Sequence, residues 1–153
     1  MKLSVVIPCY NQEAVLPALF PRMSAAAAGW GLEAEFICVD DGSADGTWRL
    51  LREQGARDPR WRALSLARNS GPQVAVSARP YQAPVDAVVI LDAAVPDPPE
   101  EIARMLEHWR QGYEVVYAVR AARQDPPLKS LLAWAGFRQV GVSFERHARQ
   151  AGA

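Results

Sequence analysis

The sequence predicts an α/β protein with a mostly parallel, Rossmann-like sheet and helices on both faces. Two observations lead to this prediction. Short runs of apolar, often β-branched residues alternate along the chain with longer segments of helical composition. Each strand-like run is nearly all apolar instead of alternating with polar residues, which is typical of strands covered on both sides. Strands and helices that alternate in this way form a parallel sheet between layers of helices.

The predicted elements follow one another at short intervals. Strands are expected at residues 3–7, 34–39, 61–67, 85–91 and 113–120. Helices are expected at residues 13–31, 46–56, 73–82, 96–112 and 126–137. Pro17 fits the first turn of its helix, whereas Pro21 predicts a kink or a later start of that helix. Asp45 comes just before the second helix and can cap it.

Length, charge and cysteine content limit the classes of function. The 153 residues fit one domain, and 50% of them are hydrophobic, so the chain can bury a core. Its 17 basic residues balance 17 acidic ones, which gives no indication of a nucleic-acid partner. No apolar run approaches the roughly 18 residues that cross a bilayer, and the N-terminus lacks a signal-peptide core. We therefore expect a cytoplasmic chain in which Cys9 and Cys38, which lack CxxC spacing, are buried and reduced.

Polar residues gather where the predicted strands end. They are Tyr10, Asn11 and Gln12 after the first strand, Asp40 and Asp41 after the second, Arg68 and Asn69 after the third, Asp92 after the fourth, and Arg120 and Arg123 after the fifth. In parallel sheets, ligands bind outside the carboxyl ends of the strands. Neither GxGxxG nor GxxxxGK[ST] is present at a suitable place, which argues against a dinucleotide fingerprint and a P-loop. A nucleotide would instead be held by carboxylates, with a divalent metal on its diphosphate.

Four ordered stretches carry a resemblance to a known family. They are "LSVVIPCYNQEAVLPAL", "FICVDDGSADGTWRLL", "LARNSG" and "AVVILDAAVPDPPEEIARML". In this order and spacing they resemble the nucleotide-sugar-binding half of family-2 glycosyltransferases, and within them the dolichol-phosphate mannosyltransferase and bacterial polyprenyl-phosphate glycosyltransferase subgroup. The resemblance implies a GT-A fold over residues 1–137, truncated relative to the family, followed by an unassigned tail at residues 138–153.

The resemblance also implies which residues bind a UDP- or GDP-sugar. Pro8 and Tyr10 match family positions that contact the base and ribose. Asp40 matches the acid that hydrogen-bonds the base, and Asp41 beside it orients the turn. Gln12 stands where the subgroup normally has Glu, so it keeps hydrogen bonding but loses the charge. From the residues alone, Asp40 could equally cap its turn.

The remaining matches concern the phosphates, the metal and the acceptor. Arg68 matches the basic residue of the family's "ARN.G" loop, although a solvated surface role is equally open. Asp92 matches the first acid of the D-x-D motif that binds Mg²⁺ or Mn²⁺. In the resembled enzymes the sugar is transferred to a polyprenyl phosphate or another acceptor, which implies contact with a membrane surface.

The sequence departs from the family at the metal motif. Ala94 replaces the second acid, Pro96 replaces a glutamine, and Asp97 is as suited to cap a helix as to bind a metal. Metal stabilisation of a leaving diphosphate is worth several kcal/mol, so its loss would slow the reaction by about three powers of ten or more. Metal binding is therefore expected to be weak or absent.

Two classes of function remain open. The chain is either a glycosyltransferase with impaired activity or a non-catalytic nucleotide-binding module. A receiver-like pocket of Asp40, Asp41 and Asp92 is a weaker third reading, because the acid pair after the first strand and the lysine after the fifth are not in place. No catalytic base can be assigned, because the last stretch of the chain does not match the acceptor-side segment that supplies it in the resembled enzymes. His108 and His147 are expected to be surface residues.

Overall fold

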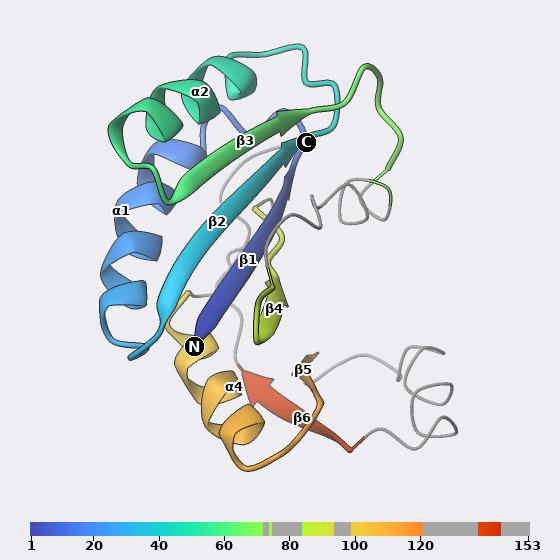
Figure 1. Cartoon of the computed structure of the whole chain (residues 1–153). Coiled ribbons are helices and arrows are strands. Elements are labelled where there is room, and N and C mark those ends of the chain that lie inside the picture. Colours follow the sequence, from blue (N-terminus) through green and yellow to red (C-terminus); the bar gives the residue numbers. More distant parts are fainter. Residues whose placement is uncertain (72–73, 75–83, 94–98, 121–137, 145–153) are drawn as a thin grey trace. The chain divides into compact units, whose positions relative to one another are not determined.

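Figure 1 shows the computed structural model of the chain. The structure describes residues 1–71, 74, 84–93, 99–120 and 138–144. The chain forms two compact units. The first, which we call the sheet unit, comprises Met1–Asp97 with Ala148–Ala153, and the second unit comprises Pro98–His147. Within the described residues, no helix combines the length and the apolar character needed to cross a membrane.

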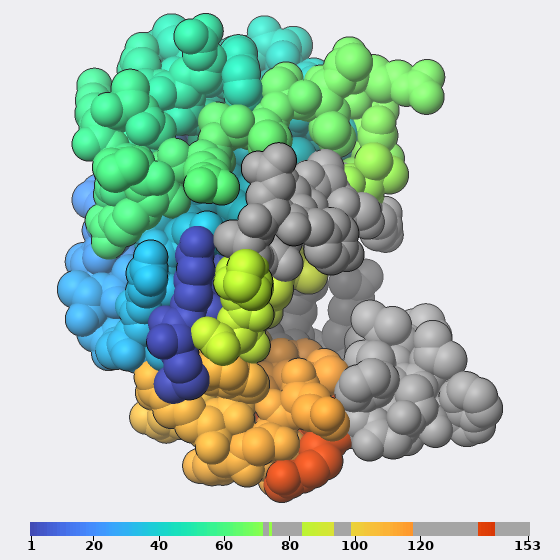
Figure 2. Space-filling view, in the orientation of Figure 1, coloured from blue at the N-terminus to red at the C-terminus, as the bar shows by residue number. Residues whose placement is uncertain are grey.

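The sheet unit contains four parallel strands in the order β3-β2-β1-β4. They are β1 (Lys2–Cys9), β2 (Glu33–Asp40), β3 (Trp61–Ser65) and β4 (Ala87–Ile90). In the space-filling view, β1 in dark blue lies between β2 in light blue and β4 in yellow-green (Figure 2). The parallel sheet confirms the α/β prediction, and each of its strands overlaps a predicted one.

Helices α1 (Leu16–Ala28) and α2 (Thr47–Arg57) cover one face of this sheet (Figure 1). Their packing centres on aromatic rings, which bury large apolar areas. The rings of Phe36 and Trp61 stack with centroids 4.3 Å apart, and Phe20 of α1 meets Trp61 edge-on at 5.0 Å. Neighbouring strands thus supply adjacent rings, and α1 supplies the ring that lies on them.

Pro21 suggested either a kink in the first helix or a later start, and the helix starts before Pro21. Helix α1 starts at Leu16 and places Pro17 in its first turn, where a missing N–H costs nothing. The helix then continues past Pro21 to Ala28. The prediction of a later start is wrong, because the buried side chains of Leu19, Phe20 and Met23 hold this segment against the sheet.

The opposite face of the sheet also carries a buried apolar cluster. Val6, Ile37 and Val39 are at most 1% exposed, and Leu64 and Leu66 pack against them. The predicted helix at residues 73–82 lies outside the described residues, Val74 excepted. The sheet is therefore apolar on both faces, as the near-continuous apolar strands predicted.

The second unit contains helix α4 (Glu101–Arg110) and the parallel strands β5 (Val115–Arg120) and β6 (Gln139–Phe144). The amphipathic helix buries Ile102 and Leu106. The sequence left residues 138–153 without an element, so β6 is a finding of the structure. The predicted helix at residues 126–137 lies outside the described residues.

Candidate functional site

The carboxyl ends of β1 and β2 lie at the same level of the sheet. Cys9, the last residue of β1, pairs with Asp40, the last residue of β2. The amide of Asp41 donates a hydrogen bond of 2.9 Å to the carbonyl oxygen of Cys9. The loop after β1 (residues 10–15) and the loop after β2 (residues 41–46) therefore start side by side.

These two loops, together with the first residue of α2, are joined by hydrogen bonds between backbone amides and side chains. Asn11 adopts a left-handed backbone conformation, with φ of 49°, and its amide donates to Ser43 Oγ at 3.0 Å. Its own Oδ1 accepts from the amide of Ala44 at 2.9 Å. Farther along, Gln12 donates its amide to Thr47 Oγ1 at 2.8 Å, and Glu13 donates to Asp45 Oδ2 at 3.2 Å. The two loops thus form one cross-braced unit.

Asp45, which the sequence suggested as the cap of this helix, precedes the N-cap residue Gly46 but still binds the first residue of α2. Its Oδ1 accepts hydrogen bonds from the amide and the hydroxyl of Thr47, the amide at 3.0 Å. Burial tends to raise the pKa of Asp45, but the hydrogen bonds from Thr47 and from the Glu13 amide outweigh it, so the pKa is lowered. The carboxylate is therefore favoured in its charged form.

The residues expected at the end of β1 differ in how accessible they are. Tyr10 is 45% exposed. Gln12 is buried, and its Nε2 donates to the carbonyl oxygen of Tyr10 at 3.0 Å. Pro8 is half-buried within β1. Tyr10 is thus the residue of this group that presents a large surface to a ligand.

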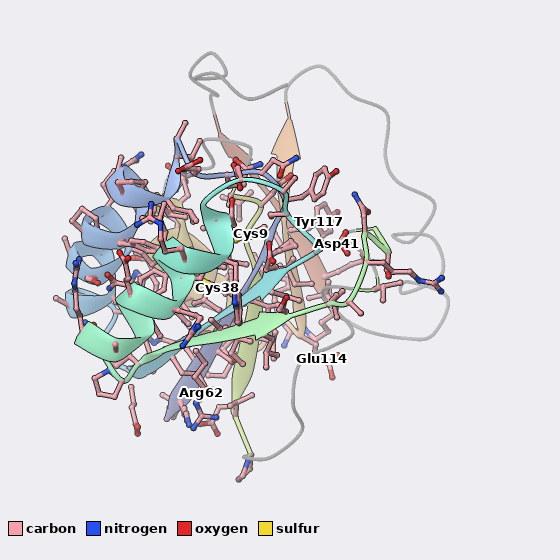
Figure 3. The ribbon with its side chains drawn as sticks, turned by 90° about the horizontal axis from the view of Figure 1, so that it is seen from above. Cys9, Cys38, Asp41, Arg62, Glu114 and Tyr117 are labelled. Atoms are coloured by element: carbon pink, nitrogen blue, oxygen red, sulfur yellow. The ribbon has the colours of Figure 1, made fainter. Side chains whose placement is uncertain are left out.

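The two acids at the end of β2 are both buried but are bound differently. Asp40 is 2% exposed, and its Oδ1 accepts from the amide of Ser43 at 3.3 Å. Asp41 is 4% exposed and lies where β2 ends (Figure 3). Its two carboxylate oxygens accept from the amides of Ser70 and Gly71 at 2.7 and 2.9 Å. Asp41 therefore links the end of β2 to the loop that follows β3.

That loop, residues 68–71, carries Arg68 with an exposed side chain. It also approaches Gly42 closely. Gly42 has a φ of +74°, and a Cβ there would lie 2.8 Å from the amide nitrogen of Asn69 and 2.9 Å from the carbonyl carbon of Arg68. Glycine is required both by the left-handed conformation and by this contact. The structure brings Arg68 and the acid pair together at neighbouring strand ends.

Cys9 and Cys38 are buried, free thiols beneath these loops, as predicted (Figure 3). The hydrogen bond with Cys38, burial and the nearby carboxylates of Asp40 and Asp92 raise the pKa of Cys9 well above its usual range. The thiol therefore stays protonated. Asp92 belongs to the same end of the sheet, because Ile90 pairs with Val6 and the Leu91 amide donates to the Val6 carbonyl oxygen at 3.0 Å.

Asp92 occupies the end of β4. It is exposed, while its neighbours Leu91 and Ala93 are only 5% and 3% exposed. The part of the chain that the structure describes contains no cluster of three His, Cys, Asp or Glu side chains able to hold a metal. Ala94, Pro96 and Asp97 lie outside the described residues. The donors that are described do not by themselves fit a divalent-metal site, which needs several hard oxygen ligands.

Comparison with known proteins identifies the family. The model of "Glycosyl transferase family 2" matches residues 4–150, which include most of the stretch that the sequence left unassigned. The chain belongs to glycosyl transferase family 2. The family resemblance seen in the four sequence stretches is thereby confirmed.

Two curated relatives are longer than the chain itself. An uncharacterised glycosyltransferase, YkcC of Bacillus subtilis (strain 168), is 30% identical over 198 residues, covering 97% of this chain and 61% of the relative. The undecaprenyl-phosphate 4-deoxy-4-formamido-L-arabinose transferase of Pectobacterium carotovorum is 48% identical over 130 residues, covering 84% of this chain and 39% of the relative. The chain thus spans only part of the length of these proteins.

A solved structure shows the same fold. The mannosyltransferase PcManGT from Pyrobaculum calidifontis, in complex with GDP-Man and Mn²⁺, has a TM-score of 0.64 and 22% sequence identity, covering 77% of this chain and 35% of that one. The GT-A fold implied by the sequence is confirmed. GDP-Man and Mn²⁺ are ligands of that complex.

Other predicted site residues belong to the second unit or lie outside the described residues. Arg120 ends β5 in the second unit, while Arg123 and His147 lie outside the described residues. His108, expected at the surface, is half-buried, and its ring meets Tyr113 edge-on at 6.0 Å.

The residues that brace the loops were not predicted from the sequence. Ser43, Thr47 and Glu13 were given no role, and Asn11 was noted only for its position. One signal was available, since Asn adopts the left-handed conformation more readily than most residues. The partners of these side chains come from different loops, so spacing along the chain could not reveal them.

Proposed function

We propose that this family-2 glycosyltransferase chain binds a UDP- or GDP-sugar at the carboxyl ends of β1, β2, β3 and β4. The observation that carries the proposal is the gathering of an exposed aromatic ring, a buried acid pair and an exposed guanidinium at neighbouring strand ends. A nucleotide presents complementary groups: a flat base, N–H donors on that base and an anionic diphosphate. Ligands of parallel α/β sheets bind at this edge.

The base and ribose are assigned to the ends of β1 and β2. The exposed Tyr10 ring offers a stacking or edge contact to the base, and Pro8 lies on the strand behind it. Gln12 supports Tyr10 through its carbonyl oxygen. Oδ1 of Asp40 accepts from the Ser43 amide, whereas no amide of its own loop donates to Oδ2. We propose that Oδ2 accepts a hydrogen bond from an N–H group of the base.

The diphosphate is assigned to the ends of β3 and β4. Arg68 is the described cation that follows a strand end in the sheet unit, and guanidinium groups bind phosphate oxygens well. Asp92 would be the protein ligand to Mg²⁺ or Mn²⁺, which would neutralise the diphosphate. Because Ala94 and Pro96 supply no acid, we expect weak metal dependence.

The reaction we propose is transfer of the sugar to a polyprenyl phosphate or another acceptor. Support comes from the 48% identity to a transferase named for undecaprenyl phosphate. Such an acceptor would bring this domain to a membrane surface. We expect low activity, because the missing acid at position 94 removes stabilisation of the leaving diphosphate.

A second candidate function is a nucleotide-binding module without turnover. It is favoured by the substitution of Ala94 and Pro96 within an otherwise family-like strand end. Transfer or hydrolysis assays with radiolabelled UDP- and GDP-sugars distinguish the two. Product formation at rates typical of enzymes, on the order of 1 s⁻¹ or above, would exclude the module and also the expectation of impaired activity.

Calorimetric titration tests the binding site itself. UDP, GDP and their sugars are titrated into the unmodified chain, with and without Mn²⁺ or Mg²⁺. We expect at least one nucleoside diphosphate to bind, and Tyr10→Ala to weaken it. Tyr113→Ala, which removes a tyrosine ring from the second unit, serves as the matched control and should leave the affinity unchanged. If no nucleotide binds at millimolar concentration, the proposal is wrong.

A further inference from the structure

Both carboxylate oxygens of Asp41 are engaged by backbone amides of another loop. Its Oδ1 accepts from Ser70 at 2.7 Å and its Oδ2 from Gly71 at 2.9 Å, while its own amide donates to Cys9 at 2.9 Å. The side chain is 4% exposed. Charge-assisted hydrogen bonds of this length are among the stronger ones in proteins. The ends of β1 and β2 and the 68–71 loop therefore meet at this residue.

The same loop is held from a second side. The absence of a side chain at Gly42 lets the backbone of Arg68 and Asn69 approach within a distance that a Cβ would not allow. Within the loop, Asn69 Oδ1 accepts from the Gly71 amide at 3.2 Å, and Ser70 Oγ donates to the Arg68 carbonyl oxygen at 3.2 Å. These contacts fix the backbone from which the exposed Arg68 side chain leaves.

We propose that Asp41 is a positioning residue that acts on the ligand through Arg68. The Asp41 carboxylate fixes the 68–71 loop and so sets where the guanidinium of Arg68 meets the anionic diphosphate. Asp41 itself makes no ligand contact, because both of its oxygens are engaged by loop amides. Asp40, in contrast, is assigned to a direct contact with the base. The positioning role of Asp41 rests on the proposed nucleotide-diphosphate site.

The proposal predicts a coupling between two residues that have no direct hydrogen bond. Asp41→Asn leaves one acceptor oxygen and turns an NH₂ group toward a backbone N–H, so the loop must shift. If Asp41 acts through Arg68, this shift matters only while the guanidinium is present. Coupling of this kind appears as non-additivity in a double-mutant cycle.

The test compares UDP and GDP with uridine and guanosine, by calorimetry on the full chain. The variants are Asp41→Asn, Arg68→Ala and the double variant. We expect Asp41→Asn to weaken diphosphate binding about tenfold and to change nucleoside binding by less than about twofold. In the Arg68→Ala background, Asp41→Asn should change diphosphate affinity by less than about twofold.

The matched control is Asp58→Asn. Asp58 also accepts a backbone amide, that of Arg60 at 3.0 Å, but it precedes β3 and so lies at the other end of that strand. It should leave nucleotide affinity unchanged. Amide hydrogen exchange of the unliganded protein gives an independent readout, because Asp41→Asn should accelerate exchange at Ser70 and Gly71.

The outcomes separate this inference from the proposed function. If the unmodified chain binds no nucleotide, both are overturned. If the unmodified chain binds a nucleotide, but Asp41→Asn weakens the affinity for UDP or GDP equally in the presence and absence of Arg68, Asp41 does not act through Arg68. Should Asp41→Asn fail to fold, Asn69→Ala perturbs the same loop from an exposed side chain. It should then weaken diphosphate binding only when Arg68 is present, and an equal effect in both backgrounds would overturn the inference.

Discussion

Two aspartates at strand ends of the same sheet are placed in opposite ways. Asp41, after β2, is 4% exposed and gives both oxygens to backbone amides of another loop. Asp92, after β4, is exposed between two buried apolar neighbours. The comparison teaches that an acid at a strand end can either be bound by the backbone of a neighbouring loop or remain exposed at that end. Sequence motifs do not distinguish these two uses.

The largest effect expected from this contrast is on stability. Asp41→Ala removes two charge-assisted hydrogen bonds and leaves their donors to be solvated by a disturbed loop, so we expect the free energy of unfolding to fall by about 3 kcal/mol. Asp92→Ala should change it by no more than about 1 kcal/mol, because an interaction of an exposed carboxylate contributes little. Urea denaturation of both variants measures the difference. Equal losses for the two would show that the contrast in their environments has no energetic meaning.

The cross-braced loops of β1 and β2 should show the next largest effect. Thr47 is fully buried, and its Oγ1 accepts from the Gln12 amide and donates to Asp45. Thr47→Val keeps the shape but leaves a buried N–H without an acceptor, at a cost of about 2 kcal/mol in the free energy of unfolding.

Thr47→Ser is the matched control, because it keeps the hydroxyl and loses only a methyl group. It should retain more of the stability than Thr47→Val in the same denaturation experiment. A larger loss for Thr47→Ser would mean that methyl packing, and not the hydroxyl, joins the two loops.

A second acid can be introduced after β4, close to Asp92. Ala94→Asp combined with Pro96→Gln restores the family pattern beside Asp92, so Mn²⁺ should then strengthen UDP or GDP binding about tenfold more than in the unmodified chain. Ala56→Asp adds the same charge at an exposed position of α2 and should have no such effect. If affinity for the nucleotide remains independent of metal, the lost acid does not explain weak metal binding.

The sequence predicted the parallel sheet and the positions of its strands because apolar runs and their alternation with helices are local features. It also placed Asp40, Arg68 and Asp92 at strand ends correctly, since a strand end is visible in the sequence. It could not show that both oxygens of Asp41 are bound by residues 29 and 30 positions away. It also assigned no strand to Gln139–Phe144, because this segment is recognised by its pairing with β5 and not by its composition.

The smallest expected effect concerns pH. The pKa of Asp45 is lowered in the folded protein because hydrogen bonds from Thr47 and Glu13 outweigh burial. A depressed pKa contributes stability above the unfolded-state value of about 3.9 and loses it as the pH falls through the folded value. The advantage of the unmodified chain over Asp45→Asn in the free energy of unfolding should therefore shrink between about pH 5 and about pH 2. Denaturation at stepped pH measures this, with Glu33→Gln, an exposed carboxylate on β2, as the control. If the difference in free energy of unfolding stays constant across that range, the charge on Asp45 does not stabilise the braced loops. The stabilisation would then come from the geometry of its hydrogen bonds alone.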